Sequence, residues 1–157
     1  MPRHATAAIK QVLESFPVLV LTRARQVGKS TPIQDLLDVG SRDYRTLDRP
    51  DDLELARTEP DALVFGDVPR TIDEVQREPG RLLAVKRAVD ERRRPGQFLL
   101  SGSANLAMMK QVSESLAGRA VYLTLHPFTI GERLGAGTGG RWDDLLFAYR
   151  ASEFTGS

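Results

Sequence analysis

The stretch TRARQVGKST, residues 22–31, contains the residue types of a phosphate-binding loop in its second half. Such a loop consists of glycine, four residues, glycine, lysine and then serine or threonine. Gly28, Lys29 and Ser30 match the end of this pattern. The glycine lets backbone N–H groups point at phosphate oxygens, the lysine reaches the β- and γ-phosphates, and the hydroxyl binds Mg²⁺. The stretch therefore predicts a triphosphate site.

The first position of the pattern holds Arg23 in place of glycine. A glycine at such a place usually relieves backbone or steric strain. An arginine there raises the energy if φ must be positive, and does no harm if its side chain projects outward. The tripeptide Gly-Lys-Ser alone occurs by chance in roughly one chain in ten of this length. Residues elsewhere in the chain must decide between a working loop, an impaired loop and a coincidence.

A pair of acidic residues, Asp73 and Glu74, lies in the stretch TIDEVQ. We expect a strand over residues 70–75, with the pair near its end. In phosphate-loop ATPases a strand-end aspartate holds Mg²⁺ through water, and a neighbouring glutamate orients and deprotonates the attacking water. The alternative is a solvated pair that opens the next turn. A phosphate loop earlier in the chain favours the functional interpretation.

Two further stretches carry candidate site residues. FLLSGSAN is a buried-type strand that ends in Ser101 and Ser103. A hydroxyl there could contact the γ-phosphate or the attacking water, although Ser103 suits the N-cap of the following helix equally well. Arg119 follows Gly118 at the end of another helix. This arginine is either a finger for a neighbouring nucleotide or a cap for helix carbonyls, and the structural role is favoured.

Apolar runs and helical spacings alternate along the chain and predict the elements that position these residues. Strands are expected over 17–22, 44–48, 70–75, 97–103 and 119–125. Helices are expected before 17, from Gly28 to about Gly40, over 51–64 with a break at Pro60, over 80–94 and over 104–118. This alternation predicts an α/β fold with a largely parallel sheet.

Composition narrows the class of protein. The chain has 157 residues, 41% of them apolar, and a formal net charge of +1, which predicts a globular fold and gives no general argument for nucleic acid or a membrane. Without cysteines it can form neither disulfides nor thiolate zinc sites. His4 and His126 lie far apart, which argues against a histidine metal site. With no apolar run long enough to span a bilayer and no signal-like N-terminus, we expect a cytoplasmic protein.

Several separated blocks resemble the N-terminal ATPase domain of a prokaryotic AAA-type family, whose members also carry a C-terminal domain of unknown function. The similarity covers roughly residues 5–134 and includes ARQVGKST, LDRPDD, TIDEVQREPGRLLAVKRAVDERRRPGQFLLSGSANL and SESLAGRAVYLTLHPFTIGE. It implies a P-loop NTPase three-layer sandwich with a central, mostly parallel sheet in the order 5-1-4-3-2. In that order the sensor strand lies between the loop strand and the acidic strand, so their carboxyl ends meet at one edge.

The resemblance also implies roles for individual residues. Asp73 and Glu74 match the Mg²⁺-binding and water-activating acids, and Ser103 belongs to the sensor strand end. Arg119 matches the arginine of the family's SLAGR block, to which no definite role is given. Ser30 and Asp73 are the expected metal ligands. The expected nucleotide-binding residues are Arg25, Gln26, Val27, Gly28, Lys29, Ser30 and Thr31.

We therefore expect an ATP- and Mg²⁺-binding core over residues 1–134 that is a slow ATPase or a nucleotide switch. The alternatives are a binding-only module and a vestigial scaffold that acts as an interaction or DNA-associated protein. GAGTGG, residues 135–140, predicts a linker, so 135–157 is expected to be a linker and the truncated start of a C-terminal region. A homo-oligomer or an unknown protein partner would involve that region.

Overall fold

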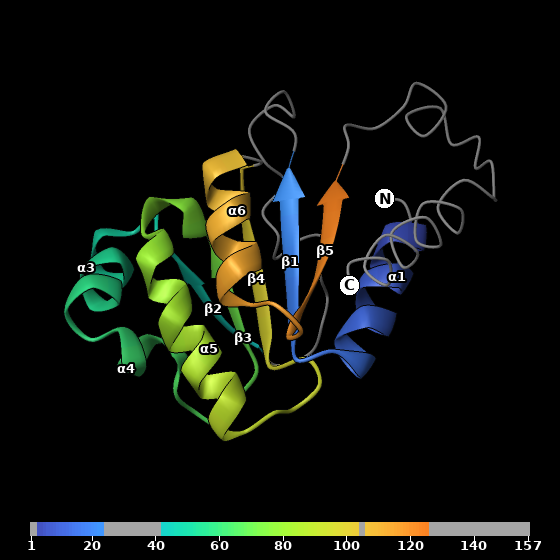
Figure 1. Cartoon of the computed structure of the whole chain (residues 1–157), viewed down its shortest axis with the longest axis horizontal. Helices are drawn as coiled ribbons and strands as arrows, with labels where there is room; N and C mark the ends of the chain where they lie inside the picture. Colours follow the sequence, from blue (N-terminus) through green and yellow to red (C-terminus); the bar gives the residue numbers. More distant parts are fainter. Residues whose placement is uncertain (1–2, 24–41, 104–105, 126–157) are drawn as a thin grey trace.

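The computed structural model describes residues 3–23, 42–103 and 106–125, and Figure 1 shows how their helices and strands are arranged. The strands are β1 (Val18–Arg23), β2 (Asp43–Thr46), β3 (Arg70–Asp73), β4 (Phe98–Ser103) and β5 (Ala120–Leu125). The helices are α1 (Arg3–Ser15), α3 (Pro50–Thr58), α4 (Pro60–Val64), α5 (Leu82–Glu91) and α6 (Leu106–Ser115), with short 3₁₀ turns η1 (Val75–Arg77) and η2 (Pro79–Arg81). The helix expected from Gly28 and the linker over 135–140 lie outside the described residues.

The five strands form one sheet in the order β2-β3-β4-β1-β5, and every neighbouring pair is parallel. This order is 5-1-4-3-2 counted from the other side, so the expected topology is confirmed. The carboxyl ends of the central strands are level, because Arg23 pairs with both Ser103 and Leu125. Thr46 likewise pairs with Asp73. The ends of all five strands therefore meet at one edge of the sheet.

The central strand β1 separates two hydrophobic cores. Val18 and Val20 pack with the core formed against α3, α4, α5 and α6. Leu19 and Leu21, which point to the opposite face, pack with Ile9 of α1 and its neighbours. All four β1 side chains are completely buried, as the uninterrupted apolar run predicts for a strand covered on both faces. The three-layer arrangement is visible in Figure 1, where α1 lies apart from the other helices.

The helices bury the faces that their spacing predicts. Leu82, Val85 and Val89 of α5 are buried together, and Ile9 and Leu13 of α1 are buried on the other side of the sheet. Pro60 starts the short helix α4 directly after α3 ends, since proline suits the first turn of a helix but not its interior. Among the described helices, none is long and apolar enough to cross a membrane.

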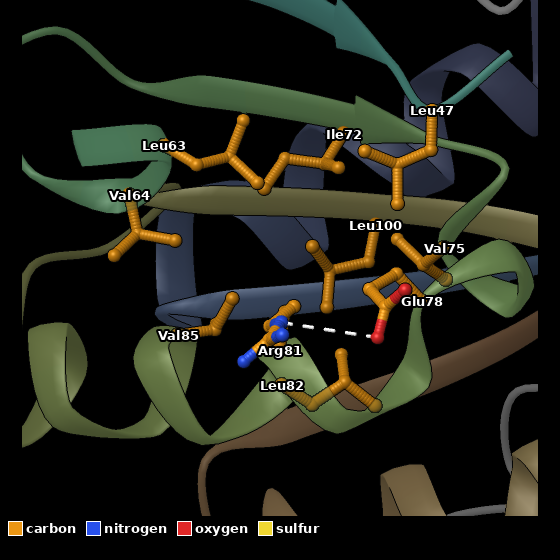
Figure 2. A pocket seen from close by; sticks show the side chains of 10 residues that line it. All are labelled: Leu47, Leu63, Val64, Ile72, Val75, Glu78, Arg81, Leu82, Val85 and Leu100. Carbon is orange, nitrogen blue, oxygen red and sulfur yellow. Dashed lines mark ion pairs between the residues drawn. The ribbon is translucent and has the colours of Figure 1, made fainter. Parts of the chain in front are cut away.

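A mainly apolar pocket lies between the sheet and α5 on the α3–α6 face. Figure 2 shows its lining, with an ion pair in which Arg81 Nε lies 3.8 Å from Glu78 Oε1. The lining residues are Leu47, Leu63, Val64, Ile72, Val75, Glu78, Arg81, Leu82, Val85 and Leu100. Ile72 faces this pocket, so the next strand residue, Asp73, faces the other side of the sheet. The pocket is thus part of the core and separate from the acidic pair.

Candidate functional site

Arg23 is the last residue of β1 and pairs in register with Ser103 of β4. Its backbone is extended, since Glu74 is the one non-glycine residue with a positive φ in the described part of the chain. The backbone strain that an arginine would suffer in a left-handed conformation therefore does not arise at this position. The predicted loop residues that follow, 25–31, lie outside the described residues, and so do their contacts.

Asp73 ends β3 with its side chain almost completely buried. Its carboxylate accepts hydrogen bonds from the Ser101 hydroxyl at 2.5 Å, the Tyr44 hydroxyl at 3.1 Å and the Glu74 backbone N–H at 2.9 Å. The first and third of these reach Oδ1, and the tyrosine reaches Oδ2. Both carboxylate oxygens are thus held in a fixed orientation by donors from three strands or strand ends.

The register of the sheet explains this arrangement. Thr71 pairs with Leu99, so Asp73 and Ser101 occupy equivalent positions two residues further along neighbouring strands and share a face. Tyr44 pairs with Thr71 on the other side of β3 and points to that same face. Asp73 and Ser101 are predicted from the sequence as site residues, whereas Tyr44 is not. The alternation of side chains along β2 predicts that Tyr44 faces Asp73 only when the pairing of β2 with β3 is known.

Glu74 has φ 58° and ψ 37°, a left-handed conformation that is uncommon for a residue with a side chain. It ends the strand and starts the turn η1, in which the Arg77 N–H donates to the Glu74 carbonyl at 3.0 Å. Such a conformation costs about 1–2 kcal/mol relative to the right-handed one. Strain of this kind persists only where surrounding contacts impose it, and it gathers at functional sites.

Gln76 connects Glu74 with the end of β4. Its amide nitrogen donates to Glu74 Oε2, and its amide oxygen accepts from the Ser103 backbone N–H at 3.2 Å. Ser103, predicted as a site residue, thus lies at the same edge as the acidic pair, and its backbone rather than its hydroxyl provides this contact. Its proposed N-cap role involves residues outside the described part of the chain. Asp73, Glu74 and Ser103 therefore lie together at the carboxyl edge of the sheet.

The chemistry of this edge suits Mg²⁺. Carboxylate oxygens are the hard ligands that Mg²⁺ prefers, and in phosphate sites it is held by one or two carboxylates together with substrate phosphates. The buried, oriented carboxylate of Asp73 is a ligand of this kind. In the described residues no group of three or more His, Cys, Asp or Glu side chains could hold a metal ion. A site that uses substrate phosphates does not require such a group.

Arg119 lies at the opposite edge of the sheet, immediately before β5 begins. It binds Asp90 through two hydrogen bonds, Nε to Oδ1 at 2.6 Å and Nη2 to Oδ2 at 3.1 Å, and the first of these lowers the pKa of Asp90. Nη1 also donates to the Ala117 carbonyl at 2.9 Å, in the turn that follows α6. About six strand residues, roughly 20 Å, separate this edge from the acidic pair. Within a single chain, Arg119 is therefore too far from Asp73 to act at the same site.

Other arginines also bind the backbone at the amino edge. Arg42 donates to the Thr71 hydroxyl at 3.0 Å and to the carbonyls of Gly96 and Arg70, each at 2.7 Å. Burial lowers the pKa of the Arg42 guanidinium to about 10, so it remains charged at neutral pH. The run of arginines 92–94 makes similar contacts with Asp67, Gly118 and Gly66. These cations hold loops and strand starts in place.

The parallel sheet in this order, with the acidic pair at its carboxyl edge, defines an α/β protein of the P-loop NTPase class. Residues 15–134 match the family model described as an AAA domain. The chain therefore belongs to the AAA domain family, whose domain is a nucleotide-binding, P-loop ATPase-like unit.

Two curated relatives are similar to most of this chain. They are the uncharacterized proteins Mb2031c of Mycobacterium bovis and Rv2008c of Mycobacterium tuberculosis, each 32% identical over 130 residues. The match covers 82% of this chain but 29% of each relative. The chain thus spans less than a third of the length of these relatives, and their similarity concerns the AAA domain.

Proposed function

We propose that this chain binds ATP with Mg²⁺ and hydrolyses it slowly, as an ATPase or a nucleotide switch. The observation that carries the proposal is the pair of acids at the sheet edge. Asp73 is buried and oriented by the Ser101 hydroxyl, and the strained Glu74 follows it directly. A rigid carboxylate beside a second, separately held carboxylate is the arrangement that metal-assisted attack by water requires.

The proposed reaction divides the chemistry among a few side chains. Lys29 and the backbone N–H groups of residues 25–31 bind the phosphates and balance the charge that develops on them. Ser30 and Asp73 would hold Mg²⁺, which neutralises phosphate charge when bound. Glu74 orients a water molecule in line with the γ-phosphorus and accepts its proton as the oxygen attacks. The bond from the γ-phosphorus to the bridging oxygen breaks, and ADP and phosphate leave.

The test compares ATP·Mg²⁺ binding, measured by titration calorimetry, with ATP turnover. We expect the chain to bind ATP at micromolar levels and Lys29→Ala to lose that affinity, because the loop then lacks its phosphate-binding cation. Lys10→Ala, which removes an exposed lysine of α1, is the matched control and leaves binding unchanged. Glu74→Gln keeps binding and lowers kcat by about 10²–10⁴-fold, the usual contribution of a general base.

Other results would select among the alternatives. Binding without turnover, and without an effect of Glu74→Gln, would indicate a binding-only module. A chain that binds nothing unless Arg23→Gly is introduced has an impaired loop. Absent binding in both, together with salt-dependent retention on DNA, would support the interaction protein instead. We also propose that a longer protein of this kind binds a protein partner or a second copy of itself through its C-terminal region.

A further inference from the structure

We infer that Gln76 is a positioning residue that couples the water-activating carboxylate of Glu74 to the end of strand β4. This inference rests on the proposed hydrolysis. Gln76 needs no contact with the nucleotide for this role, since it acts through the two residues it binds. Gln76 is the last residue of the stretch TIDEVQ, two positions after Glu74.

The two ends of one amide group make the connection. The Gln76 nitrogen donates to Glu74 Oε2, and its oxygen accepts from the Ser103 backbone N–H at 3.2 Å. A carboxamide provides a donor and an acceptor on one planar group, whereas a carboxylate has no donor and an ammonium has no acceptor. Glutamine is therefore suited to this position because it satisfies a carboxylate and a backbone N–H at once.

The turn that carries Gln76 is fixed on both sides. Val75 is buried in the core, with 4% of its surface exposed. Arg77 Nη2 lies 2.5 Å from Asp48 Oδ1, and the Arg57 guanidinium donates to Glu78 Oε2 at 3.1 Å. The backbone at Gln76 is thus held by the turn after β2, by α3 and by the core, and the amide lies between the two strand ends.

The contact with Gln76 matters because Glu74 has a left-handed backbone conformation. The side chain leaves a strained backbone position, and Gln76 is a described contact that holds its carboxylate. Because the other end of the amide binds the terminal N–H of β4, a displacement of Ser103 would move the Glu74 carboxylate as well. The state of the sensor strand end would then set whether Glu74 is aligned with water, which is a means of coupling nucleotide state to turnover.

Two substitutions separate the halves of this connection. Gln76→Glu keeps an acceptor for Ser103 but places a carboxylate against Glu74, while Gln76→Leu removes both contacts with little change in size. Gln111→Glu, at an exposed position of α6, makes the same chemical change as a control. The measurements are kcat, KM and ATP affinity on the 157-residue chain, and hydrogen exchange of the Ser103 amide without nucleotide.

We expect both Gln76 variants to lower kcat by about 10–100-fold while KM and ATP affinity change by less than about threefold, because misplacing a reacting group slows only the chemical step. Ser103 exchange rises about tenfold in Gln76→Leu and stays near the wild-type value in Gln76→Glu. In a Glu74→Gln background Gln76→Leu lowers kcat no further, since residues that act as a unit are not additive.

The outcomes also separate this inference from the proposed function. An active wild-type chain with equally active Gln76 variants overturns the role of Gln76 and leaves hydrolysis intact. Unchanged Ser103 exchange in Gln76→Leu overturns it as well, whatever the turnover. A wild-type chain without turnover overturns the proposed hydrolysis and the role of Gln76 together. A loss of kcat that persists in full in the Glu74→Gln background would show that Gln76 acts by another route.

Discussion

The two edges of the sheet are built from different kinds of contact. At the amino edge, cationic side chains bind backbone carbonyls as well as carboxylates, as Arg42 does with Gly96 and Arg70 and as Arg119 does with Asp90. At the carboxyl edge, side chains bind one another, as Ser101 does with Asp73 and Gln76 with Glu74. The carboxyl edge also contains the one left-handed non-glycine residue in the described part of the chain.

This difference indicates that contacts at the amino edge mainly stabilise the fold, whereas contacts at the carboxyl edge orient reactive groups. Backbone carbonyls are present whatever the sequence, so an arginine that binds them secures strand starts without requiring particular neighbours. Contacts between side chains require matched partners and orient reactive groups, and they support strain at Glu74 of about 1–2 kcal/mol. Removing a partly buried arginine that binds backbone at the amino edge should therefore lower the free energy of unfolding, whereas substitutions at the carboxyl edge should change Mg²⁺ affinity or turnover.

The largest effect on stability is expected from Arg42→Ala. Its removal leaves the Thr71 hydroxyl and two carbonyls without their donor, and unsatisfied partly buried groups cost about 2–4 kcal/mol in total. Chemical denaturation measures this loss, and ATP affinity below the unfolding transition should stay unchanged. Arg92→Ala removes an exposed arginine and is the control, with an expected change of less than about 0.5 kcal/mol. A similar effect of both variants would contradict the special role of Arg42.

An intermediate effect is expected from Ser101→Ala at the other edge. The variant removes the hydroxyl that orients Asp73, and losing such a supporting hydrogen bond typically weakens metal affinity by about 10–100-fold. The Mg²⁺ concentration that gives half-maximal turnover should rise by that factor. Ser15→Ala, at the exposed end of α1, should leave it unchanged. If the Mg²⁺ requirement of Ser101→Ala equals that of the wild type, the carboxyl edge does not bind metal as proposed.

The smallest effect is expected from Arg119→Ala. The bond with Asp90 is an exposed ion pair, and such pairs contribute little to stability. The melting temperature and kcat should therefore stay close to the wild-type values, as calorimetry and an ATPase assay would show. A fall in kcat of about 10³-fold that depends on protein concentration would instead identify Arg119 as a finger for the nucleotide of a neighbouring copy.

Local patterns in the sequence predicted the elements well but not the contacts between them. The apolar run at 17–22 and the spacing of Leu82, Val85 and Val89 were sufficient, because burial periodicity is a local property. The bond between Asp73 and Ser101 depends on the register of two strands, which no local pattern encodes.

The sequence patterns also did not predict unusual backbone conformations. Glutamate rarely adopts the left-handed region, so nothing in TIDEVQ predicted it at Glu74. Spacing alone assigned Arg23 to the first position of the loop pattern, and the structure adds that this residue ends β1. The phosphate-loop pattern specifies the spacing of residues in the sequence but does not predict the last residue of the strand before it.

The pairing of β1 has a consequence for how the chain folds during synthesis. Val18 pairs with Phe98 on one side and with Ala120 on the other, so this early strand finds both of its neighbours near the end of the described fold. Contacts that close such long loops form slowly, and unpaired strand edges are prone to associate until they do. A ribosome must therefore release the chain as far as Ser103 before β1 can pair along one edge, and as far as Leu125 before it can pair along the other.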